Sequence, residues 1–369
     1  MPGKQFNDPC SDCQDAEAII DVRTRHLCRD CYIQFTNRKV VRRMDYYRQI
    51  RNAPKDKRRK LLLPLSYGPS SSVLLHMLNE QLERQTSEWH GTTAYDLHVL
   101  VVDPSTISSS NPSCQERFFS LQQKYPRHTY TQIPFHDIFK YDQNIKETMK
   151  EFAGPEFEDD PSKPDKDRLD AFRASIPSAT SRTDIDNVLL NRLIIAFAKE
   201  SGCEGILWGD SDSRLASKTL ASVAKGRGSS LIWQVCDGMS PSGLQFTFPL
   251  RDLYKSELQQ YSGLIPELQD ILIPEESISA DMSARNMSID ELMMQYIQTQ
   301  GEKYPGIMAN VVRTVTKLQR PSISGAQSRC ALCGTVDVRG SSAQASEGRG
   351  ALFCYGCARS KSDMSPVTR

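Results

Sequence analysis

Four Cys-x-x-Cys pairs, two near each end of the 369-residue sequence, constrain the fold more than any other feature. Eight of the eleven cysteines belong to them: Cys10, Cys13, Cys28, Cys31, Cys330, Cys333, Cys354 and Cys357. Two cysteines separated by two residues can hold one ion from a tight turn, and two such turns complete a tetrahedral thiolate site. The spacing predicts two structural zinc ions, one in each small terminal module, with free thiols as the alternative. His26 lies inside the first module, but four thiolates already suffice there.

The other sequence-wide signals indicate a soluble, intracellular protein without a membrane partner. The first ten residues lack the apolar segment of a secretion signal, and no run approaches the roughly 20 apolar residues of a membrane span. A disulfide framework is the minor interpretation in such a compartment. The isolated Cys114, Cys203 and Cys236 are interpreted as buried or incidental thiols.

A basic run covers residues 38–60 and contains eleven Lys or Arg against two Asp, a net charge of +9. The whole chain carries only +1, so the remaining residues together carry −8. Tyr46 and Tyr47 lie within the run, and basic residues interleaved with aromatics suit an RNA backbone and stacked bases. The run predicts RNA contact, with a solvated helix face or linker as the alternative. The candidate residues are Arg38, Lys39, Arg42, Arg43, Arg58, Arg59 and Lys60.

Strand-like and helical patterns alternate after residue 60. Strands are expected at 61–66, 95–103, 128–133, 205–209 and 231–236, and helices at 73–85, 114–125, 184–201 and 211–225. This alternation predicts an α/β protein with a doubly wound, mostly parallel sheet. Further helical segments are expected near 251–262, 288–300 and 305–318. The predicted organisation is an N-terminal zinc module (1–37), a basic linker (38–60), an α/β domain (61–320) and a C-terminal zinc module (321–369). Within the domain, the acidic and proline-containing segment 147–182 is interpreted as a mobile insertion.

The first expected strand ends in a Ser- and Gly-containing turn, SYGPSSS, at residues 66–72. Backbone N–H groups of such a turn and the following helix N-terminus can hold phosphate, although an ordinary capped turn is the alternative. The turn lacks the lysine of a Walker A loop. The candidate nucleotide-binding residues are Ser66, Gly68, Ser70, Ser71 and Ser72. Asp210 and Asp212 follow a later strand at the sheet edge where α/β proteins place ligands, with helix capping as their alternative role.

The order of six features along the chain resembles that of the cytoplasmic tRNA 2-thiolation proteins. These features are the zinc module, the basic linker, the SxGxxSS loop, the GxSxxRLA segment at 209–216, the FPLRDLYKSEL segment at 248–258 and the second zinc module. That family belongs to the PP-loop, or N-type ATP pyrophosphatase, superfamily. The resemblance covers nearly the whole chain outside the acidic insertion. It points most closely to the subunit of a heterodimer whose motifs depart most from the catalytic pattern.

The resemblance implies a loss of catalytic groups in this chain. The catalytic relatives read SGGxDS in the loop, where this chain has Tyr67 in place of a Gly and Ser70 in place of the Asp that helps to hold Mg²⁺ and pyrophosphate. They also carry paired acids in a segment where this chain has Ser213 and Arg214. Their three central cysteines have no counterpart in the matching segments, so the resemblance implies no iron–sulfur cluster here. Catalytic residues are therefore expected to be absent, and ATP or Mg²⁺ binding by this chain is doubtful.

The implied process is 2-thiolation of the wobble uridine in the tRNAs for lysine, glutamine and glutamate. Its expected partners are a catalytic subunit, tRNA and a thiocarboxylated ubiquitin-related sulfur carrier, and its expected role is a non-catalytic one in RNA binding and stability. Two alternatives stay open. The chain is itself an active ATP-dependent tRNA thiolase, or it is a zinc scaffold in protein conjugation without RNA contact.

Overall fold

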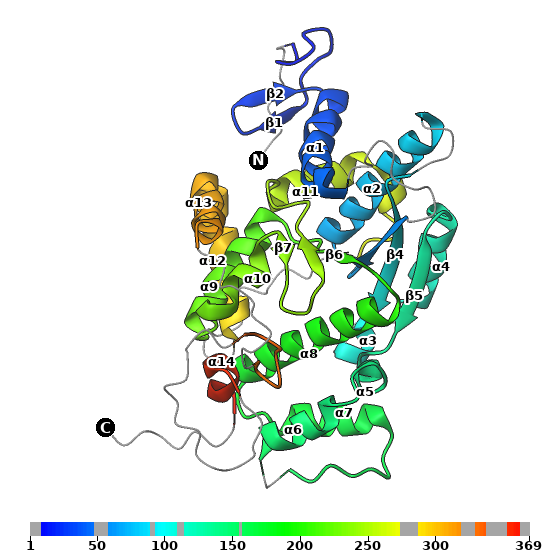
Figure 1. Cartoon of the computed structure of the whole chain (residues 1–369). Coiled ribbons are helices and arrows are strands. Elements are labelled where there is room, and N and C mark those ends of the chain that lie inside the picture. Colours follow the sequence, from blue (N-terminus) through cyan, green and yellow to red (C-terminus); the bar gives the residue numbers. More distant parts are fainter. Residues whose placement is uncertain are drawn as a thin grey trace.

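The sheet at the centre of the molecule has six strands and is mostly parallel (Figure 1). The computed structural model describes residues 9–47, 58–88, 93–108, 114–154, 157–273, 287–318, 329–336 and 353–361. The strand order is β5 (Thr129–Ile133), β4 (Tyr95–Val102), β3 (Arg59–Pro64), β6 (Gly205–Leu207), β8 (Gln245–Thr247) and β7 (Gly238–Met239). Neighbouring strands from β5 to β8 pair in parallel, and β7 is antiparallel to β8. The expected doubly wound α/β fold is confirmed.

Helices cover both faces of this sheet because β3 alternates its buried side chains between two cores. Leu61 and Leu63 belong to one core together with α2 (Pro69–Glu88), α4 (Gln115–Lys124) and α11 (Lys255–Leu264). Leu62 belongs to the other core together with α8 (Ala179–Glu200) and α9 (Asp212–Ala224). Period-two alternation within a strand buried on both faces produces this division. Pro64 ends β3 and so removes no N–H from the middle of the strand.

Shorter helices connect these elements. They are α3 (Pro104–Ile107), η2 (Phe135–Asp137), α5 (Ile138–Tyr141), η3 (Gly228–Ser230), α10 (Leu231–Val235) and η4 (Pro266–Leu268). The strand predicted at 231–236 is wrong, because this segment forms α10, in which Leu231, Ile232, Trp233 and Val235 are buried. A short apolar run bounded by turns has no periodicity that separates a buried strand from a buried helix.

The segment 147–182 contains helices that the interpretation as a mobile insertion does not account for. It includes most of α6 (Ile145–Ala153), all of α7 (Asp165–Ser175) and the start of α8. Phe152, Leu169 and Phe172 are buried and belong to the same core as α8. The apolar residues follow helical spacing within an acidic sequence, so composition alone hid them.

The N-terminal module consists of the antiparallel strands β1 (Ile20–Val22) and β2 (Arg25–Leu27), followed by α1 (Arg29–Arg43) and η1 (Met44–Tyr47). The first part of the basic run is therefore the end of α1, which packs against α2 and α11 (Figure 1). Residues 48–57 of that run lie outside the described residues. At the other end of the chain, α12 (Ile289–Lys303) and α13 (Pro305–Thr316) pack on α9, and α14 (Tyr355–Arg359) closes the second module. Over the described ranges, no helix has both the length and the apolar character needed to cross a membrane.

Candidate metal centres and the loop after β3

The eight paired cysteines form two compact clusters, and each cluster combines the two pairs of one terminal module. The N-terminal cluster is Cys10, Cys13, Cys28 and Cys31, and the C-terminal cluster is Cys330, Cys333, Cys354 and Cys357. Within each cluster the four Sγ atoms lie within 4.8 Å of one another. The Cys13 and Cys28 sulfurs are 3.9 Å apart, and those of Cys333 and Cys354 are 3.6 Å apart. A zinc–sulfur bond of about 2.3 Å gives a sulfur–sulfur edge of about 3.8 Å in a regular tetrahedron. The size and the all-thiol chemistry of both clusters fit one Zn²⁺ ion each.

The two clusters are built from the same local conformations. In each, the first pair is followed by a residue in the left-handed region, Gln14 at φ 59° and Gly334 at φ 70°. In each, the second pair begins a helix, with Cys28 as the N-cap of α1 and Cys354 as the N-cap of α14. The sequence spacing predicted four equivalent turns, whereas the structure shows one turn and one helix start in each module.

The remaining cysteines and His26 stand apart from these clusters. Cys114, Cys203 and Cys236 are buried, as expected, and belong to neither group. The His26 ring is about half exposed, and its Nδ1 contacts the Asp21 carboxylate. Over the described part of the chain, no other group of His, Cys, Asp or Glu side chains has metal-ligand spacing.

The C-terminal cluster is held against the α/β domain by arginine side chains. Arg192 Nη1 donates to the Ala331 and Leu332 carbonyls. Arg227 donates from Nη1 to the sulfur of Cys357 at 3.4 Å. These contacts tie residues at both ends of the C-terminal module to α8 and to the turn after α9.

The loop after β3 is closed by its own hydroxyl groups. The Ser66 and Ser71 hydroxyls lie 3.2 Å apart, Ser71 Oγ accepts from Ser66 N at 3.3 Å, and it donates to the Gly68 carbonyl at 3.3 Å. Ser71 and Ser72 are buried within the first turn of α2. A Cβ added to Gly209 would lie 2.9 Å from Ser71 Cα, so the loop after β6 packs directly on this turn. The Ser66 and Ser71 hydroxyls are therefore engaged with each other, whereas the Ser72 hydroxyl is buried without a hydrogen-bond partner among the described residues.

Tyr67 occupies the second position of this loop in a left-handed conformation, with φ at 59°. Its side chain is fully buried, and its carbonyl accepts from Ile273 N at 2.9 Å. Burial raises the pKa of its phenol well above the usual range, and the charges of Cys114 and Asp103 add to the effect. A left-handed backbone is costly for a residue with a Cβ, and here a buried aromatic ring fills the space beside the loop.

The carboxylates at this edge of the sheet are committed to other partners or buried. Asp103 accepts from both the backbone and the side chain of Ser105. Asp210 forms an ion pair with Lys218 at 2.6 Å. Asp212 is the first residue of α9, and Ser211 rather than either acid supplies the N-cap. Burial raises the pKa of Asp212 to about 7. A Mg²⁺–nucleotide complex needs free carboxylate and hydroxyl oxygens, and the Asp103 and Asp210 carboxylates already have partners within the protein.

The candidate RNA-binding residues divide into exposed and engaged groups. Arg38, Arg42 and Arg58 are exposed, and Arg58 also forms an ion pair with the exposed Asp96 at 3.7 Å. Arg43 is less exposed and pairs with Asp252 at 2.7 Å and with Asp237 at 3.4 Å.

The other basic candidates also contact the protein itself. Lys39 donates to the Asp252 carbonyl, and burial lowers its pKa to about 8. Arg59 donates to the Tyr46 carbonyl at 3.0 Å, and Lys60 donates to the Ser201 carbonyl at 2.9 Å.

The two aromatic residues of the basic run have different environments. Tyr46 is 59% exposed, whereas Tyr47 is buried and its hydroxyl lies 3.2 Å from that of Thr247. Only Tyr46 is therefore placed to stack with a ligand. Local charge spacing could not reveal the contacts of Lys39, Arg43 and Tyr47, because their partners lie 194 to 213 residues further along the chain.

The chain is similar over its full length to fungal proteins described as cytoplasmic tRNA 2-thiolation protein 2. A protein of Aspergillus oryzae is 55% identical, with 99% of this chain and 100% of that protein covered. A protein of Aspergillus clavatus is 53% identical with the same coverage, and one of Coccidioides immitis is 48% identical over 97% and 98% of the two chains. The family model of the same description matches residues 288–346.

Among solved structures, the U34-tRNA thiolase NcsA from Methanococcus maripaludis, determined with its [4Fe-4S] cluster, has a similar fold. The TM-score is 0.59, the sequences are 15% identical, and 95% of each chain is covered. At this identity the similarity concerns the fold alone.

Proposed function

Because this chain belongs to the cytoplasmic tRNA 2-thiolation protein 2 family, we propose that it is a cytoplasmic subunit of the complex that 2-thiolates the wobble uridine of the tRNAs for lysine, glutamine and glutamate. The sulfur donor is a thiocarboxylated ubiquitin-related carrier protein. A catalytic 2-thiolation subunit is the direct partner in a heterodimer. In that reaction ATP adenylates O2 of the uridine, and sulfur then displaces the adenylate.

The role assigned to this chain is a non-catalytic one, and the loop after β3 is the observation that carries it. Nucleotidyl transfer depends on positioned metal ions and charged groups that stabilise the transferred phosphate. Ser70 brings no charge, and the Ser66 and Ser71 hydroxyls are bonded within the loop. Tyr67 fills the adjacent space with a buried ring. The partner subunit therefore supplies the adenylation chemistry and the sulfur-carrying group, and no iron–sulfur cluster is expected in this chain.

The contribution of this chain is RNA surface and structural support. Arg38 and Arg42 are exposed on α1, and Arg58 is exposed just before β3. Exposed arginines bind phosphate and release counterions from RNA. Two structural zinc ions, one per cysteine cluster, hold the modules that flank the sheet.

A direct test compares the isolated chain with the reconstituted heterodimer. The isolated chain is expected to show no ATP–pyrophosphate exchange, whereas the heterodimer thiolates tRNA and loses activity when this chain is omitted. Exchange by the isolated chain would identify it as an active thiolase. Full thiolation by the partner alone, together with no salt-dependent tRNA binding by this chain, would favour a zinc scaffold without RNA contact.

A further inference from the structure

Arg227 is a buried arginine whose guanidinium group donates hydrogen bonds to a carboxylate and to a cysteine sulfur at the same time. It lies between α9 and η3, and the residue is only 4% exposed. Its Nε lies 2.9 Å from both carboxylate oxygens of Asp184 on α8. Its Nη1 donates to Cys357 Sγ at 3.4 Å. The planar fork of an arginine can hold two acceptors in fixed directions, which a lysine ammonium cannot do.

Asp184 connects this pair to two further elements. The Ser360 hydroxyl, just after α14, donates to Asp184 Oδ2 at 3.1 Å. Lys225 forms ion pairs with Asp184 at 2.9 Å and with Asp290 on α12 at 2.7 Å. Although burial favours its protonated form, hydrogen bonds and charge from Arg227, joined by Lys225, hold the pKa of Asp184 below its usual range. Four segments of the chain therefore meet at one charged and buried network.

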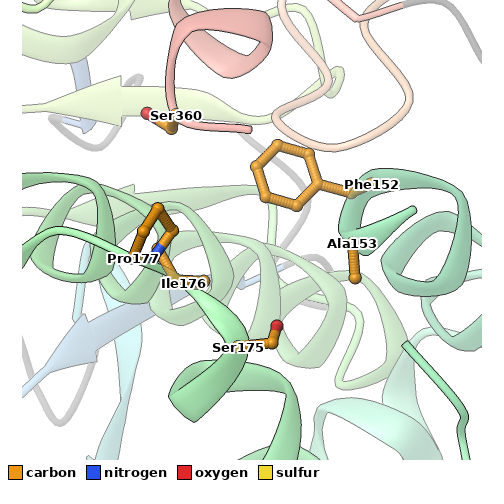
Figure 2. Close-up of a pocket in the computed structure, with 6 residues that line it drawn as sticks. All are labelled: Phe152, Ala153, Ser175, Ile176, Pro177 and Ser360. Carbon is orange, nitrogen blue, oxygen red and sulfur yellow. The ribbon is translucent and has the colours of Figure 1, made fainter. Parts of the chain in front are cut away.

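The C-terminal module packs closely on Arg227. A Cβ added to Gly356 would lie 2.5 Å from Arg227 Cγ, so only a glycine permits this approach. Figure 2 shows Ser360 of the C-terminal module on one side of a small hollow and Ile176 and Pro177 on the other, with Phe152 beside them. The hollow between these residues has no interior space large enough for a water molecule. A charge left without its partner here would stay buried, which is costly.

Metal binding changes the charge that Arg227 faces. Four thiolates around one Zn²⁺ carry a net charge of −2, and a guanidinium N–H bonded to a thiolate offsets part of it. Outer hydrogen-bond partners of metal ligands typically alter metal affinity by about 10- to 100-fold when removed. In the N-terminal cluster, no arginine donates to a cysteine sulfur among the described contacts. Among the described contacts, the C-terminal cluster thus has an arginine that donates to a cysteine sulfur, and the N-terminal cluster does not.

We propose that Arg227 is a positioning residue for the C-terminal metal site. Arg227 holds the Cys357 sulfur in place and couples the bound metal to Asp184. We then expect the loss of the metal and the separation of residues 353–361 from α8 to occur together. This inference depends on the zinc assignment made above. It adds that the two zinc sites differ in the way they are fastened to the domain.

Zinc release from the full-length chain tests the inference. Zinc content is measured first, and release into an excess of a colorimetric chelator is then followed over time. The variant Cys28→Ser/Cys31→Ser, which removes the N-terminal site, identifies the C-terminal phase. Arg227→Lys keeps the charge but cannot hold both acceptors, so we expect C-terminal release to be at least about tenfold faster and N-terminal release unchanged. Arg359→Gln on α14, an arginine that donates to the Ala224 carbonyl, is the matched control and should release both ions at the original rates.

The outcomes separate this inference from the zinc assignment. A folded Arg227→Lys variant that releases both ions at the original rates would overturn the role of Arg227. Fewer than two zinc ions in the unmodified chain would overturn the zinc assignment itself. Hydrogen exchange on the original sequence gives an answer that does not require a folded variant. After zinc removal, peptides covering 353–361 and the start of α8 should lose protection together. Loss of protection in 353–361 alone would contradict the coupling.

Discussion

The Arg23 guanidinium donates a hydrogen bond to the Glu257 carboxylate at 2.9 Å and joins the N-terminal module to the first turn of α11 across 234 residues. Arg23 lies in the left-handed region at the turn between β1 and β2, and its guanidinium is 4.3 Å from the centre of the Tyr254 ring. Glu257 is buried and also accepts from Tyr254 N at 2.9 Å, which completes the capping box of α11. One carboxylate therefore caps a helix and fastens a module.

Replacing Glu257 with Ala should lower the free energy of unfolding by about 2 kcal/mol. Loss of a helix cap costs about 1 kcal/mol, and loss of a partly buried ion pair adds a similar amount because Arg23 is 37% exposed and can be solvated. Chemical denaturation measures the change. Asp270→Ala is the control, because its pairing with Lys124 involves a carboxylate that is 73% exposed, and it should change stability by less than about 0.5 kcal/mol. Equal effects of the two changes would contradict the role given to Glu257.

The full chain should contain two zinc ions. Elemental analysis of protein purified without chelator measures the content, and Cys10→Ser/Cys13→Ser should reduce it to one. The control is Cys203→Ser, because Cys203 is buried in the core away from both clusters and should leave two ions bound. Apo modules should lose their fold, since the metal supplies folding free energy to small segments. One zinc ion in the unmodified chain would show that one cluster lacks metal, and none would show that both clusters are thiols without metal.

Asp212 should make the unmodified chain less stable as pH rises. Burial raises the pKa of Asp212 to about 7 in the folded state from an ordinary value of 3.8, so the folded state binds the proton more tightly than the unfolded state. Stability from this group is then lost between about pH 4 and pH 7 and stays constant above. Asp212→Asn lacks the titration, so the stability of the variant relative to the original chain should increase by roughly 2 kcal/mol from pH 5.5 to 7.5.

Denaturation of both proteins across that range measures this difference. Subtraction cancels the pH dependence of the cysteine clusters, which both proteins share. A constant difference between the two proteins would mean that Asp212 is ionised throughout the range.

Part of the fold and of the candidate sites could be predicted from the sequence, and part could not. Particular residues show the physical reasons. Cysteine spacing predicted both clusters, because two-residue separation limits where the sulfurs can lie. The alternation of strand-like and helical segments predicted the parallel sheet, but the short run at 231–236 has no period that distinguishes α10 from a strand. The pairing of Arg43 with Asp252 joins residues 209 positions apart. Charge counting therefore could not show that Arg43, one of the candidates for RNA binding, forms ion pairs within the protein.

This division of the basic run leads to a sharper test of RNA binding. Arg38→Glu/Arg42→Glu changes two exposed residues of α1 and should weaken tRNA binding, with the slope of log affinity against log salt reduced by roughly 1–2. The fold should remain intact. The control, Arg313→Glu/Lys317→Glu near the end of α13, makes the same change in net charge at exposed positions. Equal losses for the two variants would indicate a general charge effect, and no loss for either would show that α1 has only a solvated face.

The loop after β3 should tolerate changes that would inactivate a catalytic loop. Ser70→Ala removes a hydroxyl at the position where the resemblance places a metal-binding acid, and Cys203→Ser/Cys236→Ser removes two thiols that lie in the core. Neither change should alter the turnover of the heterodimer by more than about twofold, because nucleotidyl transfer needs charged groups that Ser70 cannot supply.

Ser71→Ala provides the contrast, since its hydroxyl bonds to Ser66 and to the Gly68 carbonyl, and it should lower the stability of this chain by about 1 kcal/mol. Thiolation of tRNA, the fraction of heterodimer and the melting temperature are measured for each variant. A hundredfold loss of turnover in Ser70→Ala, with the fold, dimer and tRNA binding preserved, would place catalysis in this chain. A small loss that follows dimer dissociation would instead support a structural role, because activity would then depend on how much partner is bound rather than on chemistry at the loop.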